Sequence, residues 1–161
     1  MKSWSVPYCE QIINDFLNDN QLINFEHFNR KYKRHIITDK TLSIWESIDD
    51  LIKSNLGIEY YLSHWIIGLK YDKGDYFAKH SDGQGNDKEG YGLRIYSGGI
   101  ELSNKNDYDG GNYILNGVDS KSKQGHLFLH KPDEVHEITK VKRGTRYSLH
   151  FCISKSSNNL I

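Results

Sequence analysis

The hydrophobic pattern of the chain changes near residue 57. Before this point, apolar residues recur every three or four positions over residues 7–17 and 41–56, which predicts two amphipathic helices. Pro7 suits a first helical turn, and Gly57 stands where the second helix is expected to end. After Gly57, short runs rich in tyrosine, isoleucine and tryptophan are separated by glycine-containing turns. These runs predict strands over residues 59–71, 75–82, 92–103, 112–116, 125–130, 135–141 and 145–154.

Helices followed by many short strands predict an α+β fold. In such a fold the strands form a sandwich or barrel and the helices cover one outer face. A chain of 161 residues has the usual size of one domain. We therefore expect a single domain over residues 1–161, with helical N-terminal support at 1–57, a catalytic strand core at 58–154 and a tail at 155–161.

The charge balance argues against a polyanionic partner. The chain has 21 Lys and Arg against 21 Asp and Glu, which gives a net charge of zero. We therefore expect no nucleic-acid partner. The longest apolar runs are too short for a spanning helix, and the opening residues MKSWSVPYCE lack the apolar run of a signal peptide. We expect a soluble, cytoplasmic protein with no membrane partner.

A candidate metal site begins with the tripeptide His80-Ser81-Asp82 at the end of a predicted strand. Residues i and i+2 of a strand point to the same face, so His80 and Asp82 can converge on one ion. Taken alone, the tripeptide is equally compatible with a turn beside a histidine. His136 lies on a later predicted strand. Two histidines and one carboxylate can occupy one face of an octahedron and leave three positions open, as in non-haem Fe(II) oxygenases.

A candidate carboxylate site lies on the last predicted strand. Arg146 and Ser148 share one face of this strand, and a guanidinium with a hydroxyl can hold a carboxylate. The opposite face is apolar and consists of Tyr147, Leu149, Phe151 and Ile153. A polar face opposite an apolar one suits a barrel with a site inside it.

Together these segments resemble the prolyl 4-hydroxylase type of 2-oxoglutarate- and Fe(II)-dependent dioxygenases. The resemblance covers roughly residues 58–154 and follows the order of the family's segments. Those segments are here 71–82 (YDKGDYFAKHSD), 107–111 (DYDGG), 125–129 (GHLFL), 136–138 (HEI) and 144–149 (GTRYSL). The resemblance implies a double-stranded β-helix, or jelly-roll, core with the N-terminal helices packed on one outer face.

The same resemblance implies roles for individual residues. The implied iron ligands are His80, Asp82 and His136. Arg146 is expected to grip the distal carboxylate of 2-oxoglutarate, with Tyr71 beside the cosubstrate and Ser148 as a further contact. The implied cofactors are Fe(II), 2-oxoglutarate and O2, and ascorbate remains open as an additional one.

The reaction implied by the resemblance is hydroxylation of a C–H bond with release of succinate and CO2. A prolyl or other side chain of a peptide or protein is the expected substrate, and a free amino acid or other small molecule is an alternative. A second alternative is a non-catalytic jelly-roll binding module with a degenerate metal site. A nucleobase demethylase is disfavoured by the balanced charge and by the lack of a second arginine after Arg146 in the same strand.

The roles of three residues are left open by the sequence, and one segment is expected to act as a lid. Glu101 stands where relatives usually carry an aromatic or apolar residue, so it either faces solvent or alters the pocket. His130 stands where relatives often carry Phe or Tyr, which makes it a pocket wall or a competing ligand. Arg94 is interpreted as a solvated residue at a strand end, or as a contact to substrate or cosubstrate. The Gly-rich, polar segment Gly83–Gly92 is expected to close over a bound substrate as a lid.

Overall fold

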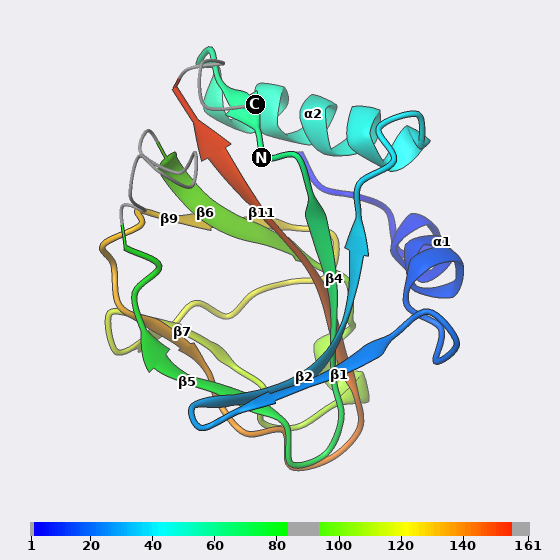
Figure 1. Cartoon of the computed structure of the whole chain (residues 1–161), viewed down its shortest axis with the longest axis vertical. Helices are drawn as coiled ribbons and strands as arrows, with labels where there is room; N and C mark the ends of the chain where they lie inside the picture. The colour runs from blue at the N-terminus through cyan, green and yellow to red at the C-terminus, as the bar shows by residue number, and fades with distance from the viewer. Residues whose placement is uncertain (1, 84–93, 156–161) are drawn as a thin grey trace.

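The protein is represented by a computed structural model that describes residues 2–83 and 94–155. It contains two α-helices, a 3-10 turn at Lys105–Asp107 and a curled antiparallel sheet in the form of a half-barrel, as expected for a jelly-roll core (Figure 1). The helices are α1 (Val6–Phe16) and α2 (Ser43–Leu56). The strands are β1 (Ile23–His27), β2 (Arg30–Ile37), β3 (Tyr61–Leu62), β4 (Ile66–Tyr71), β5 (Tyr76–His80), β6 (Arg94–Glu101), β7 (Tyr113–Leu115), β8 (Val118–Asp119), β9 (Leu127–His130), β10 (His136–Ile138) and β11 (Arg146–Ser154).

Both helices form where the hydrophobic spacing predicts them. The Ser5 hydroxyl caps α1 by accepting a hydrogen bond from the N–H of Tyr8, and Pro7 occupies the first turn. Helix α2 ends at Gly57, whose φ of 60° is the left-handed conformation that glycine adopts without strain. Within residues 2–83 and 94–155, no helix is long and apolar enough to cross a membrane.

The order of the strands brings distant parts of the sequence together. Within the described residues, eleven strands form one sheet in the order β8-β7-β10-β5-β2-β4-β11-β6-β9, with β1 added to β2 and β3 added to β11. The β5 and β10 strands, which end and begin at the predicted metal ligands, are neighbours. The β11 strand lies between β4 and β6. One sheet therefore carries both candidate sites.

Residues 23–37 lie within the region 1–57 that was expected as helical N-terminal support, but they form strands. The hairpin of β1 and β2 lies there, and β2 enters the sheet between β5 and β4. The physical reason is the sequence RKYKRHII of β2, in which charged side chains fall on both faces. No alternation of apolar and polar residues therefore marks the strand.

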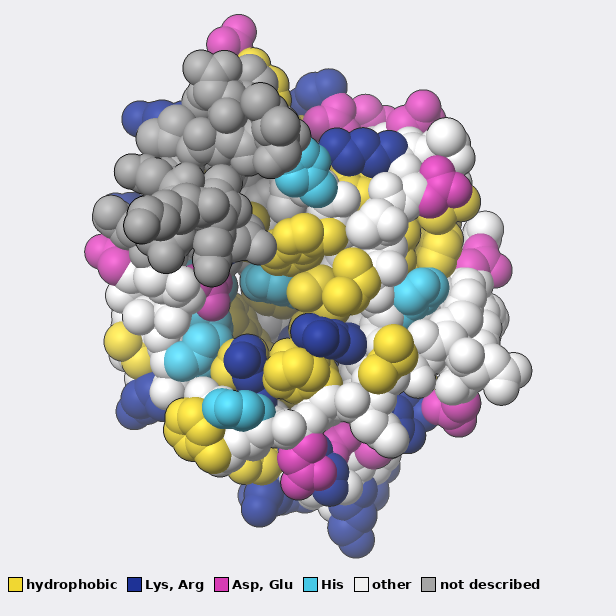
Figure 2. Space-filling view, in the orientation of Figure 1, with side chains coloured by type: hydrophobic (Ala, Val, Ile, Leu, Met, Phe, Trp, Pro, Cys, Tyr) yellow, Lys and Arg dark blue, Asp and Glu magenta, His cyan; other side chains and the backbone are white. Residues whose placement is uncertain are grey.

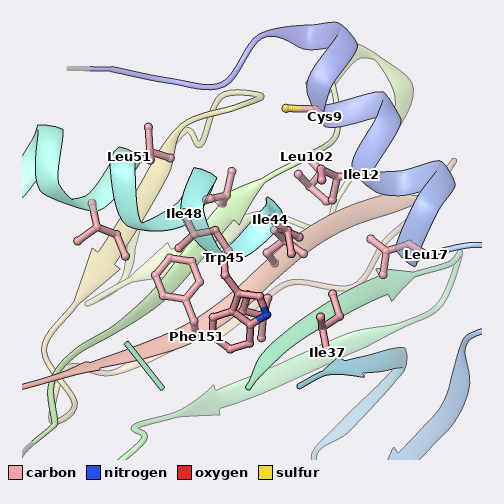
Figure 3. Close-up of a cluster of buried hydrophobic side chains, with 14 of the residues drawn as sticks. Cys9, Ile12, Leu17, Ile37, Ile44, Trp45, Ile48, Leu51, Leu102 and Phe151 are labelled. Carbon is pink, nitrogen blue, oxygen red and sulfur yellow. The ribbon is translucent and has the colours of Figure 1, made fainter. Parts of the chain in front are cut away.

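The main core lies between the helices and the outward face of the sheet. Residues of α1 and α2 share one buried cluster with residues of β4, β6 and β11 (Figure 3). On β11 the predicted apolar face is confirmed, because Leu149, Phe151 and Ile153 are fully buried in this cluster. Gly68 of β4 allows the Leu17 side chain to lie close against the strand, since a Cβ atom there would lie 2.3 Å from that side chain.

Candidate functional site

The structure brings the three predicted metal ligands together. His80 ends β5 and pairs directly with His136, which begins β10. Asp82 follows His80 by two residues, and its Oδ1 lies 3.6 Å from the Nε2 atom of each histidine. The three possible ligand atoms lie within 4.8 Å of one another, which is compact enough for one ion.

The hydrogen bonds of the two histidines leave the correct nitrogen atoms free. Nδ1 of His80 lies 2.8 Å from the Ala78 carbonyl oxygen, and Nδ1 of His136 lies 3.1 Å from the Glu134 carbonyl oxygen. A carbonyl only accepts, so each Nδ1 carries the hydrogen and each Nε2 keeps its lone pair facing Asp82. Burial, helped by the neighbouring His130, lowers the pKa of His136 to about 4, so its ring is neutral near pH 7. Two neutral imidazoles and a carboxylate fit a divalent transition metal.

His130 is more than a pocket wall. Its Nε2 lies 3.2 Å from Asp82 Oδ2, and its Nδ1 lies 2.6 Å from the Tyr113 hydroxyl. A carboxylate only accepts, so Nε2 donates to Asp82, and in the neutral ring Nδ1 accepts from Tyr113. Burial would raise the pKa of Asp82, but hydrogen bonds from His130 and Ser97 hold it well below its usual range. The contact thus engages one carboxylate oxygen and leaves Oδ1 for a metal.

The predicted carboxylate site also assembles. Arg146 and Tyr71 are paired residues of β11 and β4, and the guanidinium carbon lies 5.6 Å from the centre of the Tyr71 ring. Arg146 is buried, and its Nη1 donates a 3.3 Å hydrogen bond to the Ser148 hydroxyl. Burial raises the pKa of Tyr71, so its hydroxyl stays protonated and can donate.

Glu101 alters the pocket rather than facing solvent. It is 1% exposed, so it does not face solvent. It lies opposite Ser148 in the sheet, and its Oε2 accepts a 3.0 Å hydrogen bond from Arg146 Nε and lies 2.7 Å from Nη2. Burial raises the pKa of Glu101, against the lowering effect of Arg146. This pair fixes the plane of the guanidinium, and it was not expected from the sequence.

Both groups of residues line one cavity of about 420 Å³. The metal triad lies on the β5 and β10 part of its wall, and Arg146, Tyr71 and Ser148 lie on the β4 and β11 part. Figure 2 shows a hollow in this face, with histidine, Lys or Arg, and apolar side chains around it. Arg30 and Arg34 also line the cavity. They were missed because no strand was assigned to residues 30–37. The available signal was the placing of Arg30, Tyr32 and Arg34 at every second position, which puts them on one face of a strand.

Arg94 is not the solvated residue that one interpretation expected. Its side chain is only 10% exposed, and Nη1 lies 3.9 Å from Asp82 Oδ2. Nη1 also donates a 3.4 Å hydrogen bond to the Ser97 hydroxyl. Arg94 therefore belongs to the surroundings of the metal triad. The expected lid, Gly83–Gly92, lies outside the described residues from position 84 onward.

Comparisons with known proteins agree with this geometry at the level of the fold. No protein-family model and no curated protein sequence matches the chain. Among solved structures, a viral collagen prolyl hydroxylase from Paramecium Bursaria Chlorella virus-1, in complex with 2-oxoglutarate, is similar at a TM-score of 0.71 and 15% identity, over 95% of this chain and 92% of that one. A Pseudomonas putida prolyl-4-hydroxylase is similar at a TM-score of 0.69 and 16% identity, over 95% and 89%.

A third similar structure contains a peptide. It is a prolyl hydroxylase from Trichoplax adhaerens in complex with a fragment of the oxygen degradation domain of hypoxia inducible factor. The TM-score is 0.70 at 15% identity, over 92% of this chain and 77% of that one. The chain therefore has the fold shared by these prolyl hydroxylases.

Proposed function

We propose that the protein is a 2-oxoglutarate- and Fe(II)-dependent dioxygenase that hydroxylates a C–H bond. The observation that carries the proposal is the presence of a His-Asp-His triad and a buried Arg-Ser pair on the wall of one cavity. In the balanced reaction, one oxygen atom of O2 enters the new hydroxyl group and the other enters succinate, while 2-oxoglutarate loses CO2 and supplies two electrons.

In this proposal His80, Asp82 and His136 hold the metal and leave one side of it open to the cavity. The bound metal supplies the activation of O2 that no side chain provides. The backbone carbonyls on both Nδ1 atoms fix the orientation of the two rings, and His130 fixes the orientation of Asp82. This arrangement keeps the ligands in place before the metal arrives.

Arg146 is proposed to hold the distal carboxylate of 2-oxoglutarate. Glu101 engages the Nε side of the guanidinium, which leaves N–H groups of Nη1 and Nη2 for a ligand. Nη2 is buried and makes no hydrogen bond of good geometry with any residue that the structure describes. Ser148 and the protonated hydroxyl of Tyr71 lie beside it as further donors.

For the substrate, we propose a prolyl or other side chain of a peptide or protein. The support is the shared fold, which includes a prolyl hydroxylase in complex with a peptide. A free amino acid is the alternative, because the cavity of about 420 Å³ accommodates a small molecule beside the cosubstrate.

The test is an anaerobic titration of the metal-free protein with Fe(II) and 2-oxoglutarate. We expect the visible charge-transfer band of a chelated 2-oxo acid, and we expect His136→Ala to abolish it. The control is His64→Ala, which changes an exposed histidine outside the cavity and keeps the band. Absence of the band in the folded wild-type protein would overturn the proposal and favour a non-catalytic binding module.

A further inference from the structure

The inner face of β2 carries two arginines that the proposed reaction does not use. Arg30, Tyr32 and Arg34 alternate along the strand and all line the cavity that contains the metal triad. Both arginines are half-buried. Burial raises the pKa of Tyr32, and the charges of Arg30 and Arg34 act in the opposite direction.

Neither arginine has an acidic partner within residues 2–83 and 94–155. On the outward face of β2, by contrast, Lys31 and Lys33 form ion pairs with Glu26 and Asp72. Arg30 Nε is buried and makes no hydrogen bond among the described residues. A half-buried guanidinium without a counter-ion keeps N–H groups available for an anionic ligand.

Aromatic rings hold both guanidinium groups in place. The Arg34 guanidinium carbon lies 4.3 Å from the centre of the Phe25 ring. The Arg30 guanidinium carbon lies 5.0 Å from the same ring and 4.9 Å from the Phe77 ring. Stacking occupies the face of a guanidinium and leaves its N–H edge free to bind an oxyanion in two-point fashion. Phe77 also stacks on His80 at 3.7 Å, so this cationic wall lies next to the metal ligands.

This wall is separate from the proposed cosubstrate site. Arg34 pairs with Leu69 of β4, and Leu69 pairs with Ser148 of β11, so Arg34 lies two strands from the Arg-Ser pair. Neighbouring strands lie about 4.8 Å apart, which places the two sites roughly 10 Å apart along the sheet. Arg146 already has a counter-ion in Glu101, whereas Arg30 and Arg34 have none in the part of the chain that the structure describes.

We propose that Arg30 and Arg34 form an oxyanion subsite for the substrate, which therefore carries a carboxylate or phosphate group near the C–H bond that reacts. This inference rests on the proposed function, since it assigns the second organic ligand of the same cavity. A single anionic group fits better than a polyanion, because the arginines face into the cavity and the outward lysines are already paired.

The experiment uses matched probes and protein loaded with Zn(II) and 2-oxoglutarate. Benzoate, benzamide and phenyl phosphate are titrated, and binding is followed by saturation-transfer NMR. We expect wild type to bind benzoate or phenyl phosphate at least tenfold more tightly than benzamide. The stronger of the two anions identifies carboxylate or phosphate as the natural group.

Three variants locate the preference. Arg30→Gln and Arg34→Gln are expected to reduce it to less than threefold, and Arg34→Lys, which keeps the charge without the planar fork, to an intermediate value. Lys31→Gln removes the same charge from the outward face and is the matched control, with the preference unchanged. The inference would be overturned if Arg30→Gln and Arg34→Gln had native thermal melts and kept the preference for the anion over benzamide. It would also be overturned if Lys31→Gln lost as much of this preference as the two arginine variants.

The same spectra, with Arg146→Gln as one further variant, separate this inference from the proposed function. The signals of 2-oxoglutarate report its own binding in every spectrum. If wild type does not bind 2-oxoglutarate, the proposed function fails whatever the benzoate result. If Arg34→Gln abolishes binding of 2-oxoglutarate while Arg146→Gln leaves it intact, the arginines hold the cosubstrate and the substrate subsite is wrong.

Discussion

The two faces of β11 perform different tasks on the same backbone. The inward face presents Arg146 and Ser148 to the cavity, whereas the outward face presents Leu149 and Phe151 to the core beneath the helices. The period of two along a strand separates these tasks by one residue. Neighbouring substitutions should therefore affect different properties, except where an inward residue also stabilises the fold.

Arg146 is expected to be that exception and to show the largest effect. Arg146→Leu removes the counter-ion of a fully buried Glu101, which should cost about 3–5 kcal/mol of the free energy of unfolding and weaken binding of 2-oxoglutarate. Urea denaturation and equilibrium binding measure the two effects. The double variant Arg146→Leu, Glu101→Leu should regain most of the stability but none of the binding. A double variant as unstable as the single one contradicts this account.

The outward face should affect stability alone. Ile153→Ala leaves a void in the main core and should cost about 3 kcal/mol of unfolding free energy, and Ile153 does not line the cavity. The affinity of the folded protein for 2-oxoglutarate should match that of wild type, because the side chain points away from the cavity contacts of Arg146 and Ser148. Denaturation midpoints and binding below the transition test both statements. A tenfold change in affinity would show that the two faces are not independent.

The sequence alone predicted those features that depend on short-range pattern. The helices follow from spacing, the two faces of β11 from alternation, and the convergence of His80 and Asp82 from their i, i+2 relation on a strand. The meeting of these residues with His136 was expected from the family resemblance, and the register of β5 and β10 agrees with it.

Features that depend on sheet register were not predictable in the same way. The pair of Glu101 and Arg146 exists because β6 lies beside β11 with Glu101 opposite Ser148. The contact of His130 with Asp82 joins residues on different strands in the same manner. Strand β2 was missed because its inward face is polar, and that polar face is what the cavity uses.

His130 tests whether an inward residue can act on the metal without binding it. His130→Phe removes the hydrogen bond that orients Asp82, and loss of such an outer partner should weaken metal affinity about 10- to 100-fold. Calorimetric titration with Mn(II) measures the change. Tyr113→Phe, which removes only the hydroxyl on the far side of His130, should act in the same direction with a smaller effect. An affinity unchanged in His130→Phe shows that Asp82 needs no such partner.

The smallest effect is expected at His150 on the inward face. Its side chain should make the free energy of unfolding depend on pH. Burial lowers the pKa of His150 to about 4, below the value of about 6.5 in an unfolded chain. The folded state therefore favours the neutral ring, and its stabilisation is complete above pH 6.5 and is lost as the pH falls toward 4. Between pH 7 and pH 5, metal-free His150→Gln should lose about 1–2 kcal/mol less unfolding free energy than wild type. His64→Gln, at an exposed histidine, should lose as much as wild type. Equal losses in all three proteins would mean that His150 takes up its proton as readily in the fold as in the unfolded chain, and that stacking on Trp65 does not exclude the charge.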